Sequence, residues 1–106
     1  MKILFDQGTP VPLRRFLHPH HVDTVSERGW STLQNGTLLQ MAESNKYDVF
    51  ITTDRNLKYQ QNLSNRTIRI VVLSTTSWPK ITPKAGEVLA EIDRLPVGGF
   101  TEITII

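Results

Sequence analysis

Short apolar runs alternate with segments of helical spacing along this chain, and this alternation limits what it can fold into more than any other feature. The clearest run, residues 68–73, reads Ile-Arg-Ile-Val-Val-Leu, and residues 3–5 and 49–52 are also apolar. Apolar runs of this length are typical of strands that are buried on both faces. Further strands are predicted over residues 21–25 and 100–106.

Helical spacing is clearest near the end of the chain, where apolar residues recur at i, i+3, i+4 and i+7 (Ala85, Val88, Leu89 and Ile92). Other helices are predicted from Thr9–Pro10 to His18, over 35–45 and over 54–63, with Thr9, Asn35 and Asp54 as caps. Pro79 and Pro83 are expected in a loop. The order predicts an α/β fold: one mostly parallel sheet of about five strands, helices on both faces, and right-handed crossovers.

Length and composition set the class of protein. A chain of 106 residues suits one domain, 1–106, and is too short for two. Twelve basic and 10 acidic residues give a net charge of +2, which leans towards a nucleic-acid partner without establishing one. The absence of cysteine excludes a disulfide scaffold, a cysteine nucleophile and a cysteine metal site.

No apolar segment reaches the ~20 residues of a membrane span and no signal peptide is evident, so we expect a cytoplasmic protein.

Acidic residues follow three of the predicted strands. Asp6 comes after the first strand, Glu27 after the second and Asp54 after the third. Because parallel strands end at one edge of a sheet, these carboxylates are expected to converge there, and Mg²⁺ or Mn²⁺ prefers such oxygen ligands. The structural alternative is that Asp54 only caps a helix, Asp6 only begins a turn, and Glu27 is a solvated turn charge.

The segment Asp48-Val-Phe-Ile-Thr-Thr-Asp-Arg-Asn-Leu57, together with the opening Met-Lys-Ile-Leu-Phe-Asp, resembles a PIN-like domain. The resemblance is closest to the short PIN-like proteins related to the Mut7-C nuclease domain, and it covers roughly residues 1–75 of the chain. Many PIN domains are metal-dependent ribonucleases, and many are VapC-type toxins of toxin–antitoxin pairs. The resemblance therefore implies Asp6 and Asp54 as catalytic, metal-binding residues, with Mg²⁺ or Mn²⁺ as the cofactor and RNA as the substrate.

Three positions depart from the pattern of that family. Where the family often has a further acid, this chain has the amides Gln7, Asn35 and Asn56. An amide oxygen can ligate a cation but adds no charge. The carboxylates of Asp6 and Asp54, with the amides Asn35 and Asn56 and with Glu27 as a third carboxylate, therefore make at most a weak site for one ion. A two-metal site is harder to build from two carboxylates.

Candidate RNA contacts surround the predicted acidic site. Arg55 and Lys58 flank Asp54, and Arg28 lies next to Glu27; each can contact a phosphate. Trp30 follows a glycine in a predicted loop, where it would either stack on an unpaired base or cover the edge of the core. The alternative for the cations is an ordinary solvated face.

The segment His18-Pro-His-His21 lacks the i, i+4 histidine pair of a helical zinc site and has no cysteine partner. It is therefore predicted to be a loop that leads into a strand.

Three hypotheses of function remain open. The first is a metal-dependent ribonuclease, which could be the toxin of a toxin–antitoxin pair. The second is a PIN-like interaction module that has lost catalysis and binds RNA or an antitoxin-like protein; the amides favour it, and the Thr-Ile-Thr-Ile-Ile ending offers an edge strand for another chain, including a second copy. The third, a receiver-like phosphoacceptor domain, needs an adjacent acidic pair, which Asp6-Gln7 is not.

Overall fold

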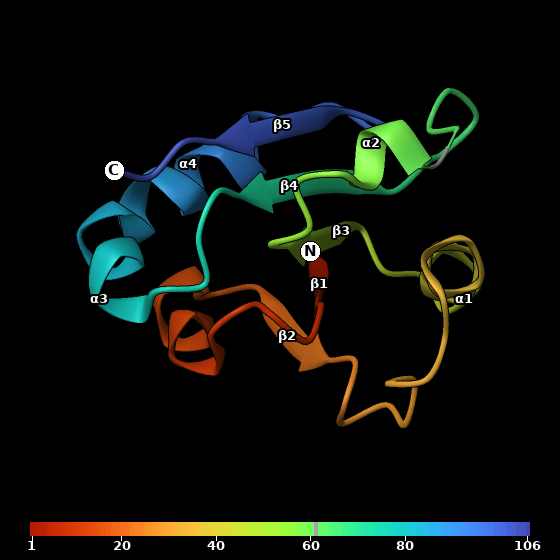
Figure 1. Ribbon diagram of the computed structural model, residues 1–106, viewed down its shortest axis with the longest axis horizontal. Helices are drawn as coiled ribbons and strands as arrows, with labels where there is room; N and C mark the ends of the chain where they lie inside the picture. Colours follow the sequence, from red (N-terminus) through yellow and green to blue (C-terminus); the bar gives the residue numbers. More distant parts are fainter. Residues whose placement is uncertain (61) are drawn as a thin grey trace.

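The core of the molecule is a five-stranded sheet in the order β2-β1-β3-β4-β5, with every neighbouring pair parallel (Figure 1). The computed structural model describes residues 1–60 and 62–106. The strands are β1 (Lys2–Phe5), β2 (His21–Thr24), β3 (Val49–Thr52), β4 (Arg69–Leu73) and β5 (Phe100–Ile103). The predicted α/β fold class, a single domain around a parallel sheet, is confirmed.

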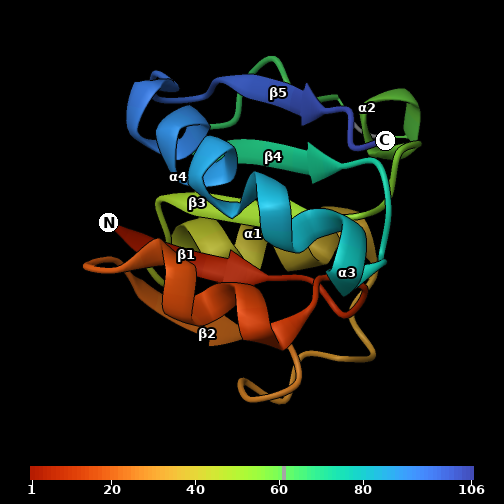
Figure 2. The ribbon, with the colours of Figure 1, turned by 90° about the vertical axis from the view of Figure 1, so that its left-hand side faces the viewer.

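Helices cover both faces of the sheet (Figures 1 and 2). One face carries η1 (Val11–Leu17), α3 (Trp78–Ile81), η2 (Thr82–Lys84) and α4 (Ala85–Arg94); the other carries α1 (Asn35–Ser44) and α2 (Leu57–Gln60). Successive residues of a strand point to opposite faces, so Ile51 joins the first core and Phe50 the second. Both are fully buried, which is why the strand sequences are continuously apolar.

The predicted strands agree closely with the structure, whereas several helix details differ. The segment after β1 is a 3₁₀ helix rather than an α-helix, and the Thr9 hydroxyl donates to the carbonyl of Ile51 at 2.9 Å instead of capping it. Asn35 is the first residue of α1 and not its cap. Pro79 and Pro83, predicted in a loop, lie in the first turns of α3 and η2, where the missing amide hydrogen of proline costs no helical hydrogen bond.

The predicted third helix, 54–63, is shorter in the structure. α2 begins at Leu57 and is described to Gln60, and the predicted continuation runs across residue 61, which lies outside the described residues.

The connection from β4 to β5 differs in hand from the others. Both β3 to β4 and β4 to β5 move in the same direction across the sheet, but the first passes over the face of α2 and the second over the face of α4 (Figure 1). Two parallel crossovers that advance the same way on opposite faces have opposite hands. The prediction that all crossovers are right-handed is therefore wrong for β4–α4–β5, an arrangement found in about 2% of such connections.

Within the described residues, no helix is both long and apolar enough to span a lipid bilayer.

Candidate functional site

Asp6 and Asp54 come together at the point where the strand order reverses. The chain leaves β1 towards β2 on one side, then returns past β1 to place β3 on its other side. β1 and β3 are paired through Phe5 and Ile51, and the amide of Asp6 donates to the carbonyl of Ile51 at 2.9 Å. In parallel sheets, the gap beyond the carboxyl ends of such a strand pair is where ligands bind.

Thr52, the last residue of β3, joins the two acidic residues. Its side chain is fully buried, and its hydroxyl donates to Oδ2 of Asp6 at 2.7 Å. The same hydroxyl oxygen accepts the backbone amide of Asp54 at 3.1 Å. One buried hydroxyl therefore fixes the carboxylate of Asp6 against the start of the loop that carries Asp54.

Asp54 is held by the two amide residues that the sequence placed near it. Nδ2 of Asn35 donates to Oδ2 of Asp54 at 3.1 Å, and the backbone amide of Asn56 donates to Oδ1 at 3.0 Å. Asp54 therefore organises the turn before α2, as in the structural alternative, while its carboxylate also faces the start of α1. The side chains of Asn35 and Asp54 are in direct contact, Asn56 contacts Asp54 through its backbone, and Thr52 links Asp6 to the Asp54 backbone.

Gln7 and Gly8 complete the loop beyond β1. The amide of Gln7 donates to Oδ1 of Asp6 at 2.9 Å, so both carboxylate oxygens of Asp6 accept a hydrogen bond from the protein. A β-carbon at Gly8 would lie 2.2 Å from the hydroxyl oxygen of Thr53. The loops after β1 and β3 thus pack against each other at a distance that leaves no room for a side chain at position 8.

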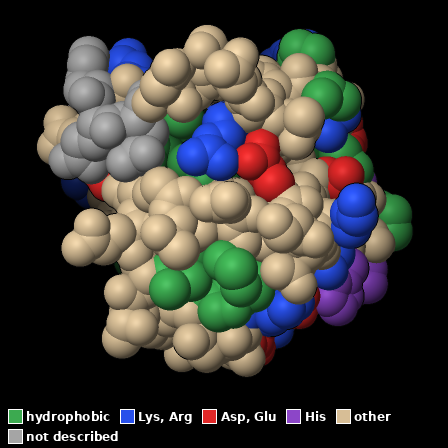
Figure 3. All heavy atoms as spheres, turned by 90° about the vertical axis from the view of Figure 1, so that its right-hand side faces the viewer, with side chains coloured by type: hydrophobic (Ala, Val, Ile, Leu, Met, Phe, Trp, Pro, Cys, Tyr) green, Lys and Arg blue, Asp and Glu red, His purple; other side chains and the backbone are tan. Residues whose placement is uncertain are grey.

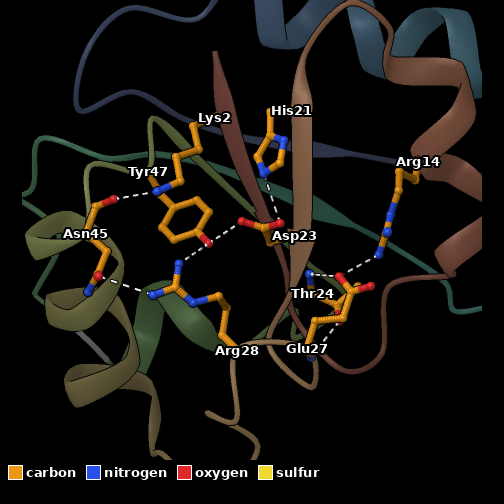
Figure 4. A network of polar contacts seen from close by, with 9 residues as sticks. All are labelled: Lys2, Arg14, His21, Asp23, Thr24, Glu27, Arg28, Asn45 and Tyr47. Atoms are coloured by element: carbon orange, nitrogen blue, oxygen red, sulfur yellow. Dashed lines mark hydrogen bonds and ion pairs between the residues drawn. The ribbon is translucent and has the colours of Figure 1, made fainter.

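Glu27 is engaged in a separate structure at the end of β2. Its Oε1 accepts from the Arg14 guanidinium at 2.8 Å and from the amide of Thr24 at 2.9 Å, while its own amide donates to the Thr24 hydroxyl at 3.0 Å (Figure 4). The hydrogen bond from Arg14 holds the pKa of Glu27 below its ordinary value. Its role here is to close the turn, and no group of three or more histidines or acids able to hold a metal occurs in the described part of the chain.

Arg28 and Trp30 are part of a polar and aromatic cluster rather than an RNA-facing loop. The Arg28 guanidinium donates to the Tyr47 hydroxyl at 2.9 Å and to Oδ1 of Asn45 at 3.2 Å, and it lies 4.4 Å from the centre of the Trp30 ring. Trp30 is only 8% exposed and packs edge-on against Tyr47. Of the two alternatives for Trp30, coverage of the core edge agrees with the structure and stacking on a base does not.

The same cluster extends to β2. The Tyr47 hydroxyl donates to Oδ2 of Asp23 at 2.5 Å, and a ring nitrogen of His21 lies 2.9 Å from the other oxygen of Asp23 (Figure 4). Burial raises the pKa of Tyr47 to about 12, and the hydrogen bond to Asp23 adds to the rise. Burial would raise the pKa of Asp23 too, but the bond from Tyr47 and the charges of His21 and Arg28 outweigh it and leave the pKa lowered.

Arg55 and Lys58 line a hollow next to Asp54. It has a volume of about 450 Å³ and is bounded by Arg55, Asn56, Lys58 and Glu102. Nε of Arg55 lies 3.4 Å from the carboxylate of Glu102. Glu102, on the strand predicted over residues 100–106, was not among the candidate site residues predicted from the sequence.

Charged side chains are interspersed on the face seen in Figure 3, where several basic side chains lie directly beside acidic ones. Candidate phosphate contacts are therefore local to the hollow and do not extend over this face as a basic surface.

Comparison of the chain with protein-family models, with curated proteins and with solved structures finds no match.

Proposed function

We propose that this protein is a metal-dependent ribonuclease of the PIN-like class, in which Asp6 and Asp54 hold one Mg²⁺ or Mn²⁺. The observation that carries the proposal is that Asp6 and Asp54 both lie at the β1–β3 switch point, where the Thr52 hydroxyl donates to the Asp6 carboxylate and accepts the backbone amide of Asp54. Ligands of parallel α/β sheets bind at this place in the fold.

The donor set fits a single hard cation. Two half-buried carboxylates lie there and supply the oxygen ligands, while the Asn35 side chain donates its amide nitrogen to Asp54. Mg²⁺ commonly binds through one or two carboxylates and completes its shell with water and substrate phosphate. Two ions that clamp both the attacking and the leaving oxygen need more carboxylates than this site has.

The residues of the chain have separate roles in the proposed reaction. A bound ion supplies polarisation of a phosphoryl oxygen and activation of a water. Thr52 and Asn35 orient the two carboxylates, and Arg55 and Lys58 hold the RNA backbone in the adjacent hollow. Arg55 reaches a phosphate by leaving Glu102, and this exchange costs little because Arg55 is 61% exposed and such pairs contribute about 0–1 kcal/mol.

A second function is supported by other observations. Both carboxylates already accept hydrogen bonds from the protein, and β5 is an edge strand, paired only with β4 among the described strands. An exposed strand edge can pair with an extended segment of another protein or with a second copy of this chain. In this alternative, the fold binds RNA or an antitoxin-like protein without cleaving RNA.

The first experiment is a calorimetric titration of the purified protein with Mn²⁺. We expect saturable binding to the wild type and at least a roughly tenfold loss of affinity in Asp6→Asn and Asp54→Asn, since each removes one charged ligand. Glu87→Gln is the matched control, because Glu87 is exposed on α4 and makes only a 3.8 Å ion pair with Lys84. Circular dichroism checks that all variants fold.

A cleavage assay on fluorescent single-stranded RNA then separates the two functions. The ribonuclease proposal predicts Mn²⁺-dependent cleavage that falls by roughly 100-fold or more in Asp54→Asn, the equivalent of about 3 kcal/mol of transition-state stabilisation. Full activity in a folded Asp54→Asn variant would refute the site. RNA binding without cleavage at any Mn²⁺ concentration would support the interaction module.

A further inference from the structure

A second hollow lies on the molecule between η1 and the beginning of β2. It has a volume of about 630 Å³, within the range of small-molecule sites. Its lining is Val11, Pro12, Arg14, Arg15, His18, Pro19, His20, His21 and Val22. None of these residues belongs to the site at the ends of β1 and β3, so this hollow is independent of the proposed function.

The lining combines positive and apolar groups and contains no acid. Five of its nine residues are arginine or histidine, and the other four are valine or proline. Acidic partners are present, but none of them lines the hollow: Glu27 contacts Arg14, Asp93 contacts His20 and Asp23 contacts His21. These contacts fix the three side chains in place around the hollow.

Three groups at the hollow are left with unused hydrogen-bonding capacity. Among the described residues, the side chains of Arg15 and His18 make no hydrogen bond or ion pair; the Arg15 guanidinium only approaches the Phe16 ring, at 5.3 Å. Nε of Arg14 is buried and has no hydrogen-bond partner, although the Nη2 atom of the same guanidinium is held by Glu27. The Nε nitrogen of Arg14 has almost no accessible surface, so the donors that a ligand in the hollow can reach are those of Arg15 and His18.

We infer that this hollow binds a small organic phosphate, a phosphate monoester with an apolar body. Arg15 and His18 line this hollow with unused donors, which suit a group with three acceptor oxygens and close to two negative charges. The side chains of Val11, Pro12, Pro19 and Val22 provide the apolar wall for the body of the ligand. Guanidinium groups are well matched to phosphate geometry.

The test uses phenyl phosphate as the probe, titrated into the ¹⁵N-labelled full chain and followed by NMR shifts. We expect saturable shifts confined to η1 and residues 18–22, and at least a roughly tenfold weaker affinity in the double variant Arg15→Gln/His18→Gln, which removes hydrogen bonds to a charged group. Both positions are exposed, so the variant is expected to fold. Lys80→Gln, an exposed charge on α3, is the matched control and should bind like the wild type.

Two further probes test the chemistry of the ligand. Inorganic phosphate should bind more weakly than phenyl phosphate if the apolar wall contributes, and benzoate should bind more weakly if the phosphate group is required. The inference is overturned if wild type shows no saturable shifts, if the double variant binds as tightly as Lys80→Gln, or if benzoate binds as tightly as phenyl phosphate. These results do not depend on Mn²⁺ binding or RNA cleavage.

Discussion

Single hydroxyl groups decide how the acidic residues of this protein are held. Thr52 joins Asp6 to the backbone of Asp54, and Tyr47 joins Asp23 to Arg28. In each case, a buried hydroxyl donates to a carboxylate and accepts from a second group. Such a hydroxyl satisfies two partners at once, so its removal leaves both without a hydrogen bond.

The variant Tyr47→Phe tests how much the hydroxyl that bridges Asp23 and Arg28 contributes to stability. The variant keeps the ring that packs against Trp30 and loses the hydroxyl, so we expect it to lower the free energy of unfolding by about 1–3 kcal/mol near neutral pH. The measurement is urea unfolding followed by circular dichroism.

The effect of Tyr47→Phe should also depend on pH. Because the pKa of Tyr47 is raised from 10.0 to about 12 in the folded state, the folded protein holds this proton more tightly than the unfolded chain does. The associated stability is complete below pH 10 and is lost as the pH rises towards 12. The difference between wild type and Tyr47→Phe should therefore shrink over this interval, and a difference that stayed constant or grew would contradict the assignment.

At the residue scale, the sequence predicted where a side chain lies in the fold better than it predicted whether that side chain is buried. Asp6, Glu27 and Asp54 were predicted to converge because strand ends are readable from local patterns; Asp6 and Asp54 lie at the β1–β3 switch point, whereas Glu27 closes a separate turn. For Trp30, the sequence left stacking on a base and coverage of the core open, and the structure decides for the core because Tyr47, from a distant segment, packs edge-on against the ring. Glu102 was missed for the same reason, since only the order of the strands places β5 near α2.

At the scale of elements, strands were easier to predict than helices. The three central strands, β1, β3 and β4, are buried on both faces, so each leaves a continuous apolar run in the sequence. η1 and α2 are short and leave weaker patterns, and α3 carries Pro79 in its first turn, a position that helices tolerate. The turn before β5 requires a glycine. Gly98 has a φ of +74°, a conformation that residues with side chains rarely adopt.

Two glycine substitutions should change stability in opposite directions. In Gly98→Ala, the β-carbon would lie 2.6 Å from the backbone oxygen of Arg66, so we expect a loss of more than about 2 kcal/mol from left-handed strain and overlap with the backbone. In Gly86→Ala, on the exposed side of α4, nothing lies within 4 Å, and we expect a gain of up to ~1 kcal/mol from helix propensity. Thermal and urea unfolding measure both, and similar stability of the two variants would contradict this account of the turn.

At the scale of the whole molecule, one sheet supports two separate cores. Trp78 packs against the core under α4, and Trp30 belongs to the core under α1. The same strands contribute alternate residues to both cores, so neither can be lost while the sheet stays intact. We therefore expect the two faces to unfold together as one cooperative unit.

The two tryptophans of the chain test this cooperativity. Trp30→Phe leaves Trp78 as the reporter of one face, and Trp78→Phe leaves Trp30 as the reporter of the other. In each variant, the urea midpoint from tryptophan fluorescence should coincide with the midpoint from circular dichroism. Separate midpoints for the two probes would show that the faces unfold independently.

The sequence by itself determined the alternation of strands and helices, the parallel sheet and the acids at the strand ends, because apolar runs, helical spacing and strand-ending residues are local patterns. The tertiary structure decided the strand order, the opposite hand of β4–α4–β5, the burial of Trp30 and the two hollows. These features depend on which face each connection crosses and on which side chains meet from distant segments. No local pattern records such contacts, since they are selected by the packing of the whole chain.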